Sequence, residues 1–117
     1  MSHAVDPTNL ATVAEPYGCT PFLLYSSADG SARVNHVTTH CELEATHVRV
    51  EGFGRGVIKR VHDGAKLSLL WPPTATETFS LIADGHGELG DDDSTLVIEV
   101  SAAVLHRPAP VDGTAGC

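Results

Sequence analysis

Residues Arg49 to Lys66 read Arg-Val-Glu-Gly-Phe-Gly-Arg-Gly-Val-Ile-Lys-Arg-Val-His-Asp-Gly-Ala-Lys. The segment holds five of the seven basic residues of a chain whose formal net charge is −8. It begins like a strand, continues through three alternating glycines, and takes helical spacing from Gly56 to His62. Glycines permit a tight turn, and the N–H groups at a helix start attract anions. We therefore expect an anion to bind where the glycines meet the helix.

We expect six strands, and the segment begins at the end of the third. Phe22 to Ser27 is an apolar run that turns at Asp29-Gly30 into a second extended run, which predicts a hairpin. A third strand is expected at Thr46 to Val50. In the second run, Arg33, Asn35, Val37 and Thr39 alternate with Val34, His36, Thr38 and His40. Neither side is plainly apolar, which suits a strand with one face against a ligand or partner.

After the segment, the pattern returns to strands. Lys66 to Trp71 is apolar and is stopped by two prolines, Thr78 to Leu89 has Gly85 and Gly87 placed for a bend or bulge, and Ser94 to Arg107 is the last long strand. A second short helix is expected near the N-terminus, where Asp6 can cap it and Pro7 can start it. The pattern predicts a mostly β protein, a six-stranded antiparallel barrel with two short helices.

The chain has 117 residues, which is room for one domain. We expect an N-terminal segment with a short helix at 1–19, the barrel at 20–107 and a flexible tail at 108–117. The acidic balance argues against nucleic-acid and membrane partners. The chain lacks an apolar run of roughly 18 residues and a signal-peptide pattern, so we expect a cytoplasmic protein. Three widely spaced cysteines argue against a disulfide framework in such a reducing compartment.

Several of these features together resemble the split-barrel flavin-binding proteins related to pyridoxamine 5′-phosphate oxidase. They are the hairpin, the strand that begins with Arg33, the strand–glycine–helix unit, the run Leu67-Ser-Leu-Leu-Trp-Pro-Pro and the run Ser80-Leu-Ile-Ala-Asp-Gly. The resemblance covers roughly Thr20 to Pro110. It implies a split β-barrel, a homodimer, and FMN or the deazaflavin F420 in a groove between subunits. If the protein is an enzyme, it is expected to be a flavin-dependent oxidoreductase that acts on an unknown small molecule.

The resemblance also implies roles for individual residues. Arg33 matches a strand arginine near the flavin phosphate or ring, and Arg55 lies at the phosphate-binding helix start, with Lys59 one turn later. Val50 and Glu51 match the strand-end pair beside the ring, and Ser80 matches a polar residue that faces the cofactor. Trp71 can stack on a flat ring or lie in the core, and the core is the more ordinary place for it.

Two positions depart from the family pattern. Val57 and Thr38 stand where the resembling oxidases carry lysines, and no residue stands out as a catalytic acid or base. The alternative function is therefore a non-catalytic dimeric module that binds a cofactor or small molecule.

The remaining motifs predict little. The glycine spacing G-x-G-x-G is not the dinucleotide fingerprint, and the aspartates at 91–93 lack the spacing of a calcium loop. His36 and His40 lie about 13 Å apart on an extended strand, which is too far for one metal ion. One histidine could still bind a haem iron, and this is the least favoured cofactor.

Overall fold

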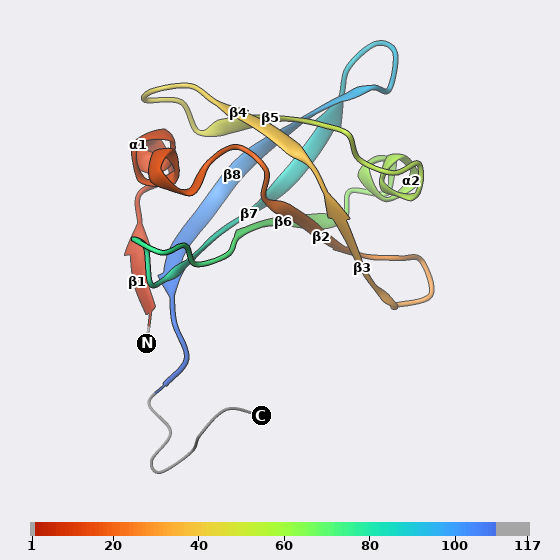
Figure 1. Cartoon of the computed structure of the whole chain (residues 1–117). Helices are drawn as coiled ribbons and strands as arrows, with labels where there is room; N and C mark the ends of the chain where they lie inside the picture. Colours follow the sequence, from red (N-terminus) through yellow and green to blue (C-terminus); the bar gives the residue numbers. More distant parts are fainter. Residues whose placement is uncertain (1, 110–117) are drawn as a thin grey trace.

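The computed structural model describes residues 2–109, and the elements form one curled antiparallel sheet with two short helices (Figure 1). The strands are β1 (Ser2–Val5), β2 (Phe22–Ser26), β3 (Ala32–His36), β4 (Thr38–Cys41), β5 (His47–Glu51), β6 (Lys66–Trp71), β7 (Ser80–Leu89) and β8 (Thr95–His106). The helices are α1 (Leu10–Ala14), between the 3₁₀ turns η1 (Pro7–Asn9) and η2 (Glu15–Tyr17), and α2 (Gly56–His62). Most of the predicted tail, residues 110–117, lies outside the described residues.

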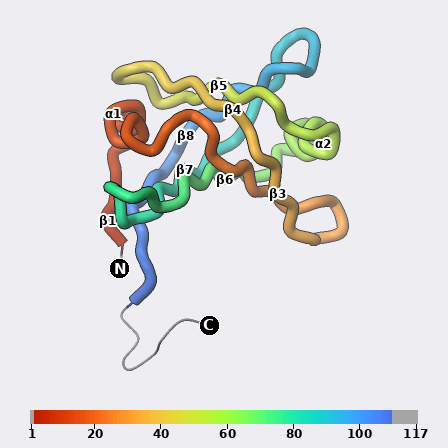
Figure 2. Tube along the Cα trace, viewed as in Figure 1, coloured from red at the N-terminus to blue at the C-terminus, as the bar shows by residue number. Residues whose placement is uncertain are grey.

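The sheet runs in the order β3-β2-β6-β7-β8-β5-β4, and β1 pairs with the end of β8. Its two outer strands, β3 and β4, are consecutive in the chain and are separated only by Val37. Backbone N–H groups of Val37 and Thr39 donate to the carbonyls of Pro21 and Cys19 at 3.1 and 2.8 Å. The sheet is therefore not a closed ring of ladders, but its two ends are halves of one extended segment, and it curls into a barrel (Figure 2).

The predicted mostly β, antiparallel class is confirmed, and the structure divides it into eight strands. One added strand is β1, which the sequence pattern did not predict. The other arises because the run from Ala32 pairs first with β2 and then, beyond Val37, with β5. The side chain of Val37 points into the core, with 3% of its surface exposed.

Strict alternation along the central strands fills the barrel. On β6 the residues Leu67, Leu69 and Trp71 are buried, and the residues between them face outward. β5 and β7 alternate in the same way, and β8 does so on either side of Ser101 and Ala102, which are both exposed. The inward residues of all these strands form a single apolar cluster.

The two helices lie at opposite ends of the barrel (Figure 1). Asp6 accepts a hydrogen bond from the Thr8 N–H at 3.0 Å, so the predicted cap of the first helical segment is confirmed. α2 packs over β7, where a Cβ atom added to Gly87 would lie 3.4 Å from Val61. The predicted helix from Gly56 to His62 is also confirmed, with Val57 and Val61 buried beneath it.

Candidate functional site

The glycine loop, residues 52–55, joins β5 to α2 and lies against the β2–β3 hairpin. Gly52 has φ +82°, a left-handed conformation that favours glycine. The Gly54 N–H donates to the side-chain oxygen of Asn35 on β3. A Cβ atom on Gly56 would lie 2.8 Å from the hydroxyl of Tyr25 on β2. These contacts hold the loop and the start of α2 close to the hairpin.

Arg60 adds a second contact between α2 and the hairpin. Its Nε donates to the carbonyl of Ser26 at 2.6 Å, and its guanidinium lies 3.1 Å from the carboxylate of Asp63. Only 23% of the Arg60 side chain is exposed. Arg60 is therefore occupied within the fold, and it is not a free cation for a ligand.

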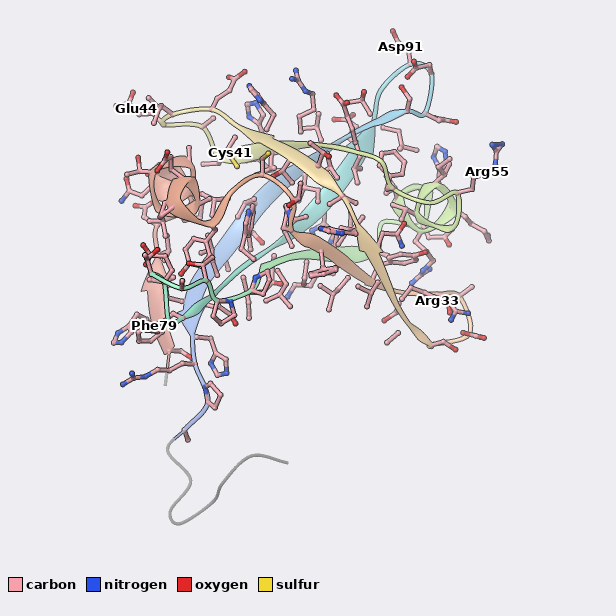
Figure 3. All side chains as sticks on the ribbon, viewed as in Figure 1. Arg33, Cys41, Glu44, Arg55, Phe79 and Asp91 are labelled. Atoms are coloured by element: carbon pink, nitrogen blue, oxygen red, sulfur yellow. The ribbon has the colours of Figure 1, made fainter. Side chains whose placement is uncertain are left out.

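The basic corner, which we define as Arg33, Arg55 and Lys59, lies on the α2 side of the molecule. Arg55 is exposed, points outward from the glycine loop (Figure 3), and has no hydrogen-bond or ion-pair partner among residues 2–109. The Lys59 side chain is 73% exposed, with a long 3.9 Å contact to Asp63. These two cations can reach an anion from the surface of α2.

Arg33 approaches from the hairpin, so the corner is spread over two elements. Arg33 pairs with Tyr25 across β2 and β3, and it lines an open groove of ≈ 330 Å³ with Lys66 and Ser68. Its charge also helps to lower the pKa of Asp29, after the larger effect of hydrogen bonds from Ser27 and Ser31. Arg33 and Arg55 lie on the same side of the molecule in Figure 3, and they come from different elements, β3 and the glycine loop.

The expected role of the helix start is weaker than the sequence suggested. α2 has seven residues, and no side chain caps its first turn. A helix this short sums few peptide dipoles, so its field at the N-terminus is small. Anion binding here depends on the side chains of the basic corner.

A polar groove on the outer face of β4 and β5 meets the glycine loop at Glu51. The groove has a volume of ≈ 180 Å³ and is lined by Thr38, Thr39, His40, Arg49 and Glu51. Thr38 lies opposite Glu51 and His40 lies opposite Arg49 in the β4–β5 ladder. The Arg49 and Glu51 side chains are 3.8 Å apart and about half exposed. The groove thus offers hydroxyl, imidazole, guanidinium and carboxylate groups within one small area.

Three predicted site residues, Val50, Trp71 and Ser80, do not lie at the polar groove or the basic corner. Val50 has no exposed surface, and Trp71 has 1%, because both point into the barrel. The indole N–H of Trp71 donates to the carbonyl of Gly18 at 3.1 Å. Neither side chain can contact a cofactor ring on the outer face, and both predicted contacts are corrected to core positions.

Ser80 lies at the opposite end of the barrel from α2. It begins β7 and pairs with His106, whereas Gly87, further along the same strand, packs beneath α2. Seven residues of extended strand span about 24 Å. Within one chain, Ser80 is therefore separated from the basic corner by nearly the length of β7.

The two positions that depart from the family pattern have different environments. Val57 is buried with no exposed surface, so a lysine there would point into the core of this chain. Thr38 is exposed and lines the polar groove. Only the second position could present a side chain to a ligand.

Sequence reasoning did not select Asn35, His40 or Arg49 as site residues. The signal was present, because the alternation had already separated Thr38 and His40 from Val37 and Thr39. The structure buries Val37 and Thr39 and exposes the other two. Polar residues at the outward positions of two neighbouring strands indicate such a groove.

His36 on β3 and His40 on β4 have different surroundings. His36 stacks on Phe22 with a ring separation of 4.6 Å, and its Nε2 lies 2.9 Å from the carbonyl of Thr20. His40 lines the polar groove. Among residues 2–109, no group of three or more His, Cys, Asp or Glu side chains is placed to hold a metal ion.

The comparisons with known proteins do not assign a family. The chain matches no protein-family model, and no curated protein matches it. In the described part of the chain, no helix has the length and apolar character needed to cross a membrane.

Proposed function

We propose that this protein is a homodimeric split barrel that binds a flavin-type cofactor, with FMN preferred and F420 as the second choice. The supporting observation is the continuity of the polar groove with the basic corner. The groove ends at Glu51, and Arg55 follows it after the three residues of a loop held against the hairpin. A ligand with a polar flat end and an anionic end matches that order of groups.

The anionic end would be held by the basic corner. Arg55 and Lys59 project from the loop and α2, and Arg33 approaches from the hairpin. A guanidinium binds a phosphate through paired N–H donors, and a charged hydrogen bond is about twice as strong as a neutral one. In a chain of net charge −8, a cation without a partner is a scarce feature.

The polar edge of the ring would meet the groove on β4 and β5. Thr38, His40 and Arg49 offer donors, and Glu51 offers an acceptor, which suits the carbonyl and N–H groups of a flavin or deazaflavin ring. When bound, such a cofactor supplies hydride or electron transfer, and the protein supplies position and electrostatics. The residues of this groove bind and orient the ring in the proposal.

The size of the groove favours a dimer. At ≈ 180 Å³, it is smaller than the roughly 300–1,000 Å³ of typical small-molecule sites. One chain therefore supplies part of a cofactor site, and a second chain is needed to cover the ligand.

An apolar row on the outside of the barrel also favours a dimer. Cross-strand pairs place Phe22 beside Leu70, Leu70 beside Ile82, and Ile82 beside Val104. All four alternate with inward core residues and are only partly buried. A contiguous apolar surface of this kind marks an interaction site more often than isolated apolar residues do.

A non-catalytic cofactor carrier is the second candidate. It is favoured by the buried position of Val57 and the neutral side chain of Thr38, because neither can supply the cation that the resembling oxidases use. The carrier would bind the same ligand without turning it over. Reduction of the bound cofactor by a nicotinamide donor under anaerobic conditions would favour the enzyme.

The cofactor proposal is tested by the visible spectrum of the purified protein and by titration with FMN and with F420. We expect flavin or deazaflavin absorbance, and we expect Arg55→Ala to weaken binding by roughly 10- to 100-fold, the effect of losing one charge-assisted hydrogen bond. Arg107→Ala is the matched control, since it removes the same charge from the end of β8, where the guanidinium lies over Phe79. A colourless protein that binds neither cofactor would refute the proposal.

The dimer is tested separately by sedimentation equilibrium at micromolar concentration. We expect twice the mass of the chain, and we expect Leu70→Arg to give monomers because it places a charge in the middle of the apolar row. Leu43→Arg is the control, because Leu43 is 76% exposed in the loop after β4 and lies outside the row. A monomeric wild-type chain would contradict a site shared by two subunits.

A further inference from the structure

Two cysteines face one cavity between α1 and β4, which shares Thr39 with the polar groove and none of its lining with the basic corner. The cavity has a volume of ≈ 270 Å³, and its lining includes Ala11 and Ala14 from α1, Cys19, and Thr39 and Cys41 from β4. Both cysteines are free thiols. The alanines are small, so the space around the two sulfur atoms is not filled by α1. Figure 3 shows Cys41 on the side of the barrel that carries α1.

The backbone sets how close the two cysteines are. Thr39 N–H donates to the Cys19 carbonyl at 2.8 Å, and Val37 N–H donates to the Pro21 carbonyl at 3.1 Å. These bonds continue the antiparallel register in which Phe22 lies opposite His36. Cys19 therefore lies opposite Thr39, and Cys41, two residues further along β4, is its diagonal neighbour on the same face.

Diagonal neighbours have Cα atoms about 7–8 Å apart, and their Cβ atoms are somewhat closer. A disulfide usually needs a Cα separation of about 4.4–6.8 Å, so a small approach is required. The segment that contains Cys19 belongs to no helix or strand, and Cys19 is exposed, so the approach needs no regular element to break. It does require the hydrogen bonds accepted by the Gly18 and Cys19 carbonyls to shift. Cys41 is held in β4 and need not move.

We propose that Cys19 and Cys41 form a reversible intramolecular disulfide when the protein meets hydrogen peroxide. The Cys19 thiolate attacks one peroxide oxygen, the O–O bond breaks, and hydroxide leaves, so that Cys19 becomes a sulfenic acid. The Cys41 sulfur then attacks the Cys19 sulfur, the S–O bond breaks, and the oxygen leaves as water with the Cys41 proton. The two thiols lose two electrons and two protons, and the peroxide becomes two molecules of water.

The order of attack follows from exposure. Cys19 is open to solvent, so peroxide reaches it first. Cys41 is partly buried, and burial raises the pKa of its thiol, so it stays protonated and reacts slowly with dissolved oxidant. A partly buried thiol beside an oxidised cysteine acts as the resolving residue, because the sulfenic acid forms within the same cavity.

The single tryptophan of the chain provides an independent signal. Trp71 donates its indole N–H to the carbonyl of Gly18, the residue directly before Cys19. Movement of Cys19 toward β4 displaces this carbonyl and changes the surroundings of the indole. Oxidation should therefore alter the intrinsic fluorescence, and reduction should restore it.

The experiment uses the full chain with Cys117→Ser, which removes the third cysteine. Treatment with equimolar hydrogen peroxide should remove both titratable thiols, lower the mass by two hydrogen atoms, and produce a peptide in which Cys19 and Cys41 are linked. Dithiothreitol should reverse the mass and the fluorescence change. The same treatment of Cys19→Ser and Cys41→Ser variants in this background should cause no fluorescence change, and each should retain the fold by circular dichroism.

Peptide mapping of the unaltered pair keeps the test independent of the variants. Unlinked sulfinic or sulfonic acids at Cys19, disulfides only between two chains, or loss of a single thiol would each overturn the proposal. None of these readouts involves a flavin, so the thiol pair and the cofactor site can fail separately.

Discussion

Gly85→Ala is expected to lower the free energy of unfolding by about 3 kcal/mol, at the upper end of what overpacking of a core costs. A Cβ atom at Gly85 would lie 2.0 Å from the backbone carbonyl oxygen of Glu99 and 3.0 Å from the side chain of Ile98. Backbone atoms of a paired strand cannot rotate away, so β8 would have to move. Chemical denaturation followed by circular dichroism would measure the loss.

The close approach at Gly85 comes from a bulge in the β7–β8 ladder. Asp84 pairs with Ala102 and Gly85 pairs with Val100, so Ser101 is the extra residue on β8. A bulge bends its strand and increases the local twist, which helps a sheet to curl. The glycine is needed because the two backbones come so close that a Cβ atom would meet the Glu99 carbonyl.

Gly87→Ala is the matched control, two residues further along the same strand. A Cβ atom there would meet the ends of flexible side chains, at 2.6 Å from Leu96, 2.9 Å from Leu67 and 3.4 Å from Val61. The ends of these side chains can shift, so we expect a cost of about 1 kcal/mol, at the lower end of what overpacking of a core costs. Equal losses at the two positions would show that general crowding, and not the backbone contact, limits the substitution.

Much of the second half of the fold was predictable because its signals are local. An apolar run stopped by two prolines predicted β6 from Lys66 to Trp71, and the glycines at 85 and 87 predicted the irregularity that the structure has at Gly85. β1 was not predictable in this way. Its four residues from Ser2 to Val5 carry no clear alternation, and they form a strand because the end of β8 offers a partner.

The division between β3 and β4 also depends on long-range pairing. From Ala32 to Cys41 the chain is continuous and extended, and no glycine or proline marks a break. The break at Val37 appears where the pairing strand changes from β2 to β5. A local pattern cannot contain that information, because the partners are set by the curl of the whole sheet.

The candidate site shows where a family resemblance and the residue pattern conflict. Val50 alternates with Arg49 and Glu51, so the period of the strand already placed it inward, and the structure buries it. Ser80 was grouped with the helix start because both belong to the family pattern, but sequence order carries no measure of distance across a barrel. Arg55 and Glu51 are exposed, as an outer loop and an outward strand position predict, and their role in binding a cofactor stays a prediction.

Experiment can separate the two predictions made for Trp71, a place in the core and a contact with the cofactor ring. Trp71→Ala is expected to lower the free energy of unfolding by about 3–5 kcal/mol, because it removes the largest fully buried side chain and leaves a cavity. That loss is comparable with much of the total stability of a small domain, about 5–15 kcal/mol. Thermal unfolding followed by circular dichroism would show it as a large fall in the midpoint.

Trp71→Phe keeps an aromatic side chain in the core and removes the hydrogen bond to the carbonyl of Gly18, which is an exposed residue. We expect a cost of about 1–2 kcal/mol for the bond and the smaller ring together, and a folded protein. This variant should bind FMN or F420 as the wild type does, because position 71 faces the core and not the groove. A Trp71→Phe protein that is as stable as the wild type but binds the cofactor much more weakly would place Trp71 at the ring and contradict its core position.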